Sequence, residues 1–414
     1  MASNKEVEFN PLSPEILNNP ISALAEVREA TPVYKVPSMG IYMVTRYDAI
    51  QEVLKKPTLF SNAHLASVFS RSESPEVKAV RAEGYDDGHS VPVLDPPEHT
   101  SYRRMWNDVF FPRFRKLNEP ITKVVNDYID EFSTERPVDF VEEFAGPVSV
   151  GVMAETLGLP RSDVGILKRF ADLGVEAMGG TLTLEEELER VRFTVNFQNY
   201  IVENIEKRKT DGTDNLLSDI SKATMDGEPI VMADKLAMAS ALLTAGTETT
   251  SKMIATGLKL LLDHPDQFEA VLEDRSLVPN LVEEVLRHEG PVKGLFRIAL
   301  EDTEVAGIPI PKGAHLQLMW MSANRDEKQF EQADVFDVRR KNARKHLAFG
   351  GGIHNCIGSP MARMEGEIAF NILFDRVHDI RLSDKNDFAR APSAIMWGLK
   401  HLYIDIGSID PRID

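Results

Sequence analysis

Cysteine is almost missing from this sequence, because Cys356 is the only one among 414 residues. A single thiol excludes an intramolecular disulfide and a zinc site built from several cysteines. It also excludes an iron–sulfur cluster, which several cysteine thiolates hold. The thiol is therefore either a small buried side chain or a group with chemistry of its own.

Long apolar runs are missing as well. The longest uncharged run near the middle, residues 236–247, is shorter than the roughly 20 residues that a helix needs to span a bilayer. The first residues, MASNKEVEFNPLSPEI, are polar and charged, unlike a signal peptide or a membrane anchor. We expect a cytoplasmic protein without membrane contact.

Linkers are absent too, since no stretch rich in Ser, Gly and Pro divides the chain. A chain of 414 residues that is 43% hydrophobic can bury a large core. Its length alone allows two or three domains. Without a linker, we interpret residues 1–414 as one domain.

Positive charge is in short supply, and the formal net charge is -18. Phosphate contacts need a basic face, which argues against a general nucleic-acid-binding function. Basic residues nevertheless gather in two clusters: Arg103, Arg104, Arg113, Arg115 and Lys116, and Arg339, Arg340, Lys341, Arg344 and Lys345. Each cluster is either a solvated surface or part of a positive patch that binds an acidic partner.

The run HLAFGGGIHNCIGSPMAR surrounds the thiol. Three consecutive glycines, residues 350–352, precede it and Gly358 follows it, which predicts tight turns against a flat or bulky neighbour. Apolar residues then recur every three to four positions over residues 359–374, so we expect Cys356 in a loop at the N-terminus of a helix. Free amides and the helix dipole favour a thiolate there.

Six positions of this run match the cytochrome P450 haem-binding pattern F-[GS]-x-G-x-[HR]-x-C-x-G: Phe349, Gly350, Gly352, His354, Cys356 and Gly358. The sequence therefore resembles a soluble, bacterial-type cytochrome P450. The resemblance implies a mainly α fold with small β-sheets (α+β), in which a triangular helical domain and a β-rich region enclose a buried haem b (iron protoporphyrin IX). It also implies that the Cys356 thiolate binds the iron and that Phe349 and Gly350 contact the haem.

The longest helical pattern, residues 232–264, contains the run AGTETT. A glycine inside a helix costs about 1 kcal/mol relative to alanine, so this small, polar patch either packs closely against a neighbour or leaves room for a ligand. It is similar to the family motif [AG]-G-x-[DE]-T-[TS]. The resemblance implies that Ala245 and Gly246 lie over the haem. It further implies that Thr249 bonds dioxygen and that Glu248, where aspartate is more usual, relays protons.

The run DPPEH, residues 95–99, begins another helical pattern, with His99 and Arg103 four residues apart on one face. Alone, this is typical of a surface pair. It is similar to the family pattern D-P-P-x-H-x-x-x-R, whose histidine and arginine bind the haem propionates. By the same resemblance, Arg297 and His354 are the third and fourth groups for these two carboxylates. Without it, Arg297 is interpreted as an exposed strand residue.

Glu284 and Arg287 form an E-x-x-R pair on a predicted helix, residues 279–289. Such pairs decorate many helices and contribute only a few tenths of a kcal/mol. In the family the pair forms a buried network with an arginine before the cysteine loop, and Arg340 is the best match. Because buried charges must be paired, we predict that all three are inside and structural.

The remaining elements follow from periodicity and turn residues. We expect helices over residues 21–31, 47–56, 161–178 and 183–208, the last two forming a lid by resemblance with Gly179-Gly180 as their turn; a hairpin over residues 33–36 and 41–44; strands over residues 295–300, 303–305, 316–321, 380–382, 395–397 and 402–406; and an irregular loop over residues 61–94.

Positions that match the family's substrate pocket are mostly small or apolar: Ala241, Thr244, Ala245, Gly294, Leu295, Ile395 and Met396. This composition favours a neutral or weakly polar organic molecule over one held by an ion pair. Lys293 would contradict this expectation if its side chain entered the pocket.

The resemblance implies a haem-thiolate monooxygenase that inserts one atom of O2 into a C–H bond, by hydroxylation or O-dealkylation. Electrons would come from a ferredoxin and a ferredoxin reductase that uses NAD(P)H, since the chain carries no flavin or iron–sulfur module of its own. The alternatives are a peroxide-using or isomerase-type haem-thiolate enzyme, a non-catalytic haem sensor and, most remotely, a scaffold without haem.

Overall fold

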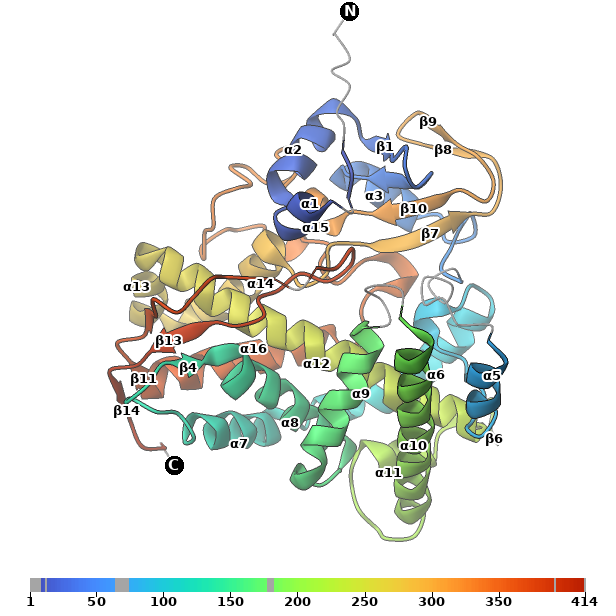
Figure 1. The fold of residues 1–414 in the computed structure, drawn as a ribbon, viewed down its shortest axis with the longest axis horizontal. Coiled ribbons are helices and arrows are strands. Elements are labelled where there is room, and N and C mark those ends of the chain that lie inside the picture. Colours follow the sequence, from blue (N-terminus) through green and yellow to red (C-terminus); the bar gives the residue numbers. More distant parts are fainter. Residues whose placement is uncertain (1–8, 12, 64–73, 177–181, 391, 413–414) are drawn as a thin grey trace, which may run out of the picture.

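The structure is a computed structural model that describes residues 9–11, 13–63, 74–176, 182–390 and 392–412. Helices form most of it, and short strands gather into small sheets at two sides (Figure 1). The predicted mainly α fold with small β-sheets is confirmed. Among the described helices, none combines the length and the apolar character that crossing a membrane requires.

Helix α12 (Met232–Asp263) runs through the middle of the molecule (Figure 1). It contacts α8 (Gly146–Leu157) and α9 (Val164–Glu176) on the one hand, and α14 (Val278–Glu289) and α16 (Ser359–Arg376) on the other. Most of its side chains are buried among these neighbours, as expected of a helix that is apolar over much of its surface. Any group next to α12 therefore lies deep inside the protein.

The other helices surround this centre. They are α1 (Pro14–Asn18), α2 (Ile21–Ala30), α3 (Tyr47–Leu54), α5 (Pro75–Arg81), α6 (Glu98–Phe114), α7 (Asn118–Ile129), α10 (Leu184–Arg208), α11 (Leu216–Ser221), α13 (Pro265–Glu273) and α15 (Trp320–Ala323). Helix α10 begins with a complete capping box, in which Thr183 and Glu186 each satisfy a backbone amide of the other.

A five-stranded sheet in the order β1-β2-β10-β7-β3 packs beside α2 and α3. Its strands are β1 (Val33–Lys35), β2 (Tyr42–Val44), β10 (His315–Leu318), β7 (Leu295–Ala299) and β3 (Phe60–Ser61). All pairs are antiparallel except β10 with β2, so segments far apart in the sequence meet here. The sheet holds β7, which carries Arg297, at a fixed position.

Four smaller sheets complete the described part. One has three strands in the order β12 (Arg381–Leu382), β13 (Tyr403–Asp405) and β4 (Val138–Asp139). The other three pair β8 (Thr303–Val305) with β9 (Ile308–Ile310), β5 (Thr224–Met225) with β6 (Glu228–Pro229), and β11 (Val377–His378) with β14 (Ser408–Ile409).

Three predicted elements are wrong in part. The loop expected over residues 61–94 contains α5, whose start is marked by Ser74, an N-cap, followed by a proline. The strand expected over residues 316–321 ends at Leu318, and α15 follows. The strand expected over residues 395–397 is reduced to one isolated bridge, between Met396 and Val292. The predicted turn at Gly179-Gly180 lies outside the described residues.

The predicted buried charge network is confirmed. The side chain of Glu284 accepts hydrogen bonds from Arg287 at 2.7 Å and from Arg340 at 3.0 Å, and all three are buried. The two guanidinium groups also donate to main-chain carbonyls of the irregular segment that precedes the cysteine loop, including the carbonyl of Val335, which both contact. One carboxylate thus fixes the path of that segment to α14.

We predict that Arg340→Ala lowers the free energy of unfolding by about 3–5 kcal/mol, because it leaves part of a buried carboxylate without its partner. Urea unfolding followed by circular dichroism measures the change. The matched control is Arg339→Ala, which removes an exposed arginine one residue away. Equal stability of the two variants would contradict a buried structural role for Arg340.

Candidate functional site

The loop before α16 is bent so that Cys356 faces back toward Phe349. The Cys356 amide donates to the Phe349 carbonyl at 2.9 Å. Gly350 and Gly352 adopt φ values of +66° and +63°, which side-chain-bearing residues rarely adopt. A Cβ on Gly352 would lie 2.7 Å from the Leu54 carbonyl oxygen. The glycines are therefore required both by the turns and by the close contact with the segment around Leu54.

A second buried carboxylate anchors this loop. Glu283, next to the network described above, accepts from Arg363 of α16 at 2.7 Å and lies 3.0 Å from the ring of His346. Arg363 also stacks over the ring of Phe349, 4.6 Å from its centre. Burial acts to raise the pKa of Glu283, but His346 and Arg363 outweigh it and lower the pKa to about 2. The carboxylate is ionised, and it ties the loop to α14.

The Cys356 thiol lies deep inside the protein and yet is accessible to solvent. Both hold when a side chain faces an internal hollow. Burial raises the pKa of Cys356, although the amides of Gly358 and Ser359 and the charge of Arg103 act in the opposite direction. The expectation that the loop alone favours a thiolate is therefore wrong, because desolvation exceeds the effect of the amides. A thiolate here requires a further positive charge.

The four predicted propionate-binding residues are partly brought together by the structure. The rings of His99 on α6 and His354 in the cysteine loop are 4.2 Å apart. Arg103 and Arg297 both act electrostatically on His354. Within the described residues, neither arginine forms an ion pair with a carboxylate, and both ring nitrogens of His99 and Nδ1 of His354 are buried without a hydrogen-bond partner.

Burial of these groups without an anion is reflected in their acid–base behaviour. Burial lowers the pKa of Arg297 to about 10. Burial, followed by the neighbouring His99, Arg297 and Arg103, lowers the pKa of His354 to about 3. His354 is therefore neutral, and its imidazole can donate one hydrogen bond. Buried polar groups usually have partners, so this cluster fits a ligand that carries negatively charged oxygens.

The middle of α12 exposes one stripe of side chains although the helix runs through the interior. Ala245 is exposed, and its neighbours at helical spacing are half-buried: Ala241, Thr244, Glu248, Thr249 and Lys252. The Thr249 hydroxyl donates to the Ala245 carbonyl at 2.6 Å. Such a bond between a threonine and the carbonyl four residues earlier bends a helix. Space adjoins α12 along this stripe.

Gly246 does not belong to that stripe. A Cβ at this position would lie 2.9 Å from Cε of Met153 on α8. The glycine allows α12 and α8 to approach closely, and the expected contact of Gly246 with the cofactor stays a prediction. Close helix packing was the alternative reading of the AGTETT run, and it holds at Gly246 while Ala245 and Thr249 remain on the open side.

Glu248 sits in a charged cluster that sequence reasoning missed. It forms an ion pair with Lys252 and a hydrogen bond with Asp172 of α9, which in turn pairs with Lys168 at 3.0 Å. Burial acts to raise the pKa of Glu248, but Lys252 and Lys168 hold it below its usual value, whereas burial raises the pKa of Asp172. Glu248 and Lys252 are four residues apart on one helix, so their ion pair could be predicted from the sequence. No feature of the sequence indicates that Asp172 joins them.

A cavity of about 280 Å³ adjoins this cluster. Glu248, Lys252 and Lys168 line one side of it, and Glu142 lies on its wall as well. A space of this size and polarity holds several waters. Glu248 thus borders a space that can hold water, and Ala245 is not among the residues that line it.

The chain is similar over nearly its whole length to bacterial haem enzymes. It is 33% identical over 389 residues to 6-deoxyerythronolide B hydroxylase of Saccharopolyspora erythraea, which covers 91% of this chain and 94% of that protein. The chain belongs to the cytochrome P450 family. The Cytochrome P450 family model matches residues 183–378.

Two solved P450 structures are also similar to this P450. Cytochrome P450 CYP109Q5 from Chondromyces apiculatus has a TM-score of 0.86 at 31% identity, over 97% of this chain and 99% of that one. CYP109E1 from Bacillus megaterium, in complex with corticosterone, has a TM-score of 0.81 at 30% identity, over 94% and 99%. Members of the family bind haem through a cysteine thiolate, so haem is the cofactor of this P450, and the protein is a haem monooxygenase. The donors around Cys356 fit that cofactor, whose two carboxylates would satisfy the unpaired groups.

The positions expected to line the P450 substrate pocket fall into two groups. Leu295 is half-buried, like Thr244, whereas Ile395 and Met396 are buried. A Cβ on Gly294 would lie 2.2 Å from the Leu318 carbonyl oxygen, so this glycine allows close packing against the end of β10, and its place in the pocket stays a prediction. The Lys293 side chain, left open by the sequence, bonds the carbonyls of Leu17 and Ser393.

Three residues of the basic clusters are not exposed in this P450: Arg103 is half-buried, and Arg113 and Arg340 are buried. Arg113 is buried and pairs with Asp214 and Asp219, and Arg340 is buried against Glu284. The exposed members that remain are Arg104, Arg115, Lys116, Arg339, Lys341, Arg344 and Lys345. The interpretation as a patch applies to these residues only.

Glu365 on α16 is a buried acid with no cationic partner among the described residues. Its Oε1 accepts from the Ser149 hydroxyl of α8 at 2.7 Å, and its Oε2 has no partner. Burial raises the pKa of Glu365 to about 7, although the Ser149 bond acts to lower it. The folded P450 thus holds a proton that the unfolded chain, with a glutamate pKa of about 4.3, releases earlier.

We predict that the stability of this P450 falls as pH rises from about 4.5 to 7, by about 3 kcal/mol from Glu365 alone, because the folded state binds more protons in that window. Glu365→Gln removes this component of the slope and raises stability at pH 8. Urea unfolding from pH 5 to 8.5 measures it, with the exposed Glu269→Gln on α13 as control. An unchanged slope in Glu365→Gln would contradict a protonated carboxyl.

Proposed function

We propose that this P450 hydroxylates or O-dealkylates a neutral, largely apolar organic molecule. The observation that carries the proposal is a thiol that is surrounded by protein atoms and is still accessible to solvent, together with buried donors that have no anion. In this proposal Cys356 binds the haem iron. His99, Arg103, Arg297 and His354 hold the haem carboxylates, and Phe349, Gly350 and Ala245 contact the macrocycle.

Bound haem would supply the activation of O2 and the insertion of one oxygen atom into a C–H bond. The chain's own residues hold the substrate, exclude bulk water and move protons. Cys356 would hold the metal as a thiolate, and the positive charge of the metal would supply the stabilisation that the loop amides alone do not. Its neighbours Arg103 and Arg363 are placed to stabilise the resulting thiolate.

Protons reach the open side of α12 by way of Glu248 in this proposal. The carboxylate is ionised in its pair with Lys252, while its hydrogen-bonded neighbour Asp172 retains a proton more readily. A proton taken up from water in the cavity beside Lys168 can pass to Glu248 Oε, and then to the Thr249 hydroxyl one residue along the helix. The presence of this acid and alcohol favours monooxygenation over a peroxide-using or isomerase-type activity.

The substrate class follows from what the open stripe and its surroundings offer. Thr244 contributes a hydroxyl, and Ala241, Leu295, Ile395 and Met396 contribute apolar surface. An ammonium group of Lys293 inside the pocket would contradict this interpretation. The group instead donates hydrogen bonds to the carbonyls of Leu17 and Ser393. The corticosterone bound by the similar CYP109E1 supports a neutral polycyclic molecule as the kind of substrate.

The electron donor is proposed to be a ferredoxin, reduced by a ferredoxin reductase with NAD(P)H. The exposed members of the two basic clusters support this proposal; they include Arg104, Arg115, Arg344 and Lys345. The protein as a whole is acidic, with a net charge of -18. A local positive surface on an acidic protein selects an acidic partner and orients it. The cations belong to α6 and to the segment just before the cysteine loop, so docking there brings the donor to the thiolate side.

We predict that Glu248→Gln lowers kcat by about 100-fold, because a side chain that cannot carry a proton replaces the relay. NAD(P)H consumption falls less than product formation, so more electrons are used per product. The measurement is product and cofactor turnover with a reconstituted ferredoxin system. The control is Glu142→Gln, which neutralises another carboxyl on the wall of the same cavity. Equal kcat values in the two variants would contradict proton transfer through Glu248.

The proposed function as a whole is tested with 18O2 and corticosterone as the first probe, followed by other neutral polycyclic compounds. We predict that one 18O atom appears in the product and that formation requires ferredoxin, reductase and NAD(P)H. Mass spectrometry of the product measures both. Product that carries oxygen from water, or that forms only with added peroxide, would contradict the proposed monooxygenase function.

A further inference from the structure

Lys293 is a buried lysine that the proposed mechanism does not use. Its side chain is 3% exposed, and no carboxylate of the described residues lies within ion-pair distance of it. Its ammonium donates to the carbonyl of Leu17 at 3.2 Å and to that of Ser393 at 2.9 Å, and lies 5.0 Å from the centre of the Trp397 ring. Burying a cation in this way is unfavourable unless its hydrogen bonds are satisfied, so these contacts define what the residue does.

Both carbonyls belong to segments that need an outside donor. Leu17 is in the last turn of α1, where helix carbonyls have no partner within the helix. Ser393 begins a turn, residues 393–396, in which its hydroxyl accepts from the amides of Ile395 and Met396 at 3.2 and 3.0 Å. Lys293 therefore joins the N-terminal helix to this turn.

The backbone around Lys293 also forms hydrogen bonds with this turn and with the residue after it. Its amide donates to the Ile395 carbonyl at 2.7 Å, and the Trp397 amide donates to the Pro291 carbonyl at 2.8 Å. Gln317 of β10 donates its side-chain amide to the Ala394 carbonyl at 3.2 Å. Three successive carbonyls of the turn are thus each held by a donor from outside it: two by Lys293 and one by Gln317.

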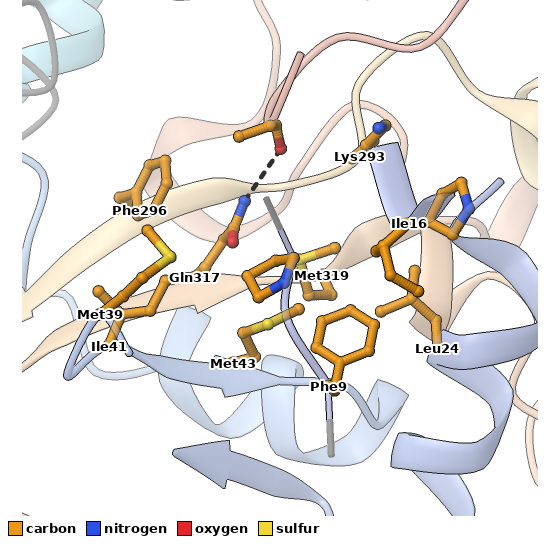
Figure 2. A pocket seen from close by; sticks show the side chains of 13 residues that line it. Phe9, Ile16, Leu24, Met39, Ile41, Met43, Lys293, Phe296, Gln317 and Met319 are labelled. Carbon is orange, nitrogen blue, oxygen red and sulfur yellow. Dashed lines mark hydrogen bonds between the residues drawn. The ribbon is translucent and has the colours of Figure 1, made fainter. Parts of the chain in front are cut away.

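A small cavity lies beneath this arrangement. It has a volume of about 30 Å³, and Figure 2 shows Gln317 at its centre with its bond to Ala394, Lys293 at one edge and apolar side chains such as Phe9, Met43 and Met319 around the rest. Because this cavity adjoins Ala394, the turn is not closely packed on that side. The directed hydrogen bonds provide what packing does not.

We propose that Lys293 is a positioning residue for substrate selectivity: with Gln317, it holds the turn 393–396 so that Ile395 and Met396 form a fixed wall of the substrate pocket. This inference rests on the proposed function, in which Ile395 and Met396 line that pocket. It makes helix α1, which lies outside the pocket, part of its support. Releasing the turn lets the substrate move relative to the oxidising centre.

The test uses Lys293→Met in the holoenzyme, which keeps the length of the side chain and removes its donors. Hydrogen exchange measured by mass spectrometry at the Ile395 and Met396 amides is expected to rise about tenfold, the effect of losing one charge-assisted hydrogen bond. With corticosterone as probe, we expect the dissociation constant from the spectral shift to rise and the ratio of oxidation positions to change. Lys312→Met, at an exposed lysine, is the control.

Increased exchange together with a changed product ratio supports the proposal. Unchanged exchange overturns it, and so does increased exchange with an unchanged product ratio, because Lys293 is then structural only. If Lys293→Met does not fold, Gln317→Leu tests the same turn through the Ala394 carbonyl, with the same two readouts. If the wild-type protein oxidises no neutral polycyclic probe, the proposed substrate class fails, while the exchange measurement still decides whether Lys293 holds the turn.

Discussion

The interaction on which the structure depends is the attraction between a group that the protein must bind and a set of hydrogen-bond donors that it encloses without an anion. His99, Arg103, Arg297 and His354 are held by α6, β7 and the cysteine loop, and no described carboxylate pairs with either arginine. Burying such groups is unfavourable unless an anion joins them. The Cys356 thiol presents the complementary need, because burial raises its pKa and a nearby positive charge would lower it. A metal held in a dicarboxylic ring meets both needs at once.

The rest of the fold keeps these groups in place before the cofactor binds. Glu284 fixes the segment that leads to the cysteine loop, and Glu283 fixes the loop itself through Arg363 and His346. Buried carboxylates with several donors tolerate little displacement, because each lost bond leaves a charge uncompensated. On the other side, α12 turns a stripe of small and polar residues toward the open space. Rigid elements thus carry every group for which we propose a chemical role.

Sequence reasoning worked where a local pattern dictates the outcome. The glycines of the cysteine loop and the long helix α12 were predicted because turns and periodicity leave visible traces, whereas the triad at Glu284 was predicted from the family resemblance. It failed where the outcome depends on contacts between residues that are far apart in the sequence. The direction in which Gly246 faces depends on α8, and the burial of Arg113 depends on two aspartates about a hundred residues away. The balance that raises the Cys356 pKa, and the contacts of Lys293, likewise arise only after folding.

The central claim is that the sulfur of Cys356 binds the haem iron. Its most direct measurement is the absorption spectrum of the reduced holoprotein with carbon monoxide, recorded for the wild type and for Cys356→Ser. We predict the red-shifted Soret band typical of thiolate ligation in the wild type, and its loss in the serine variant even where haem is retained. A wild-type spectrum without that band, or a serine variant that keeps it, would contradict the claim.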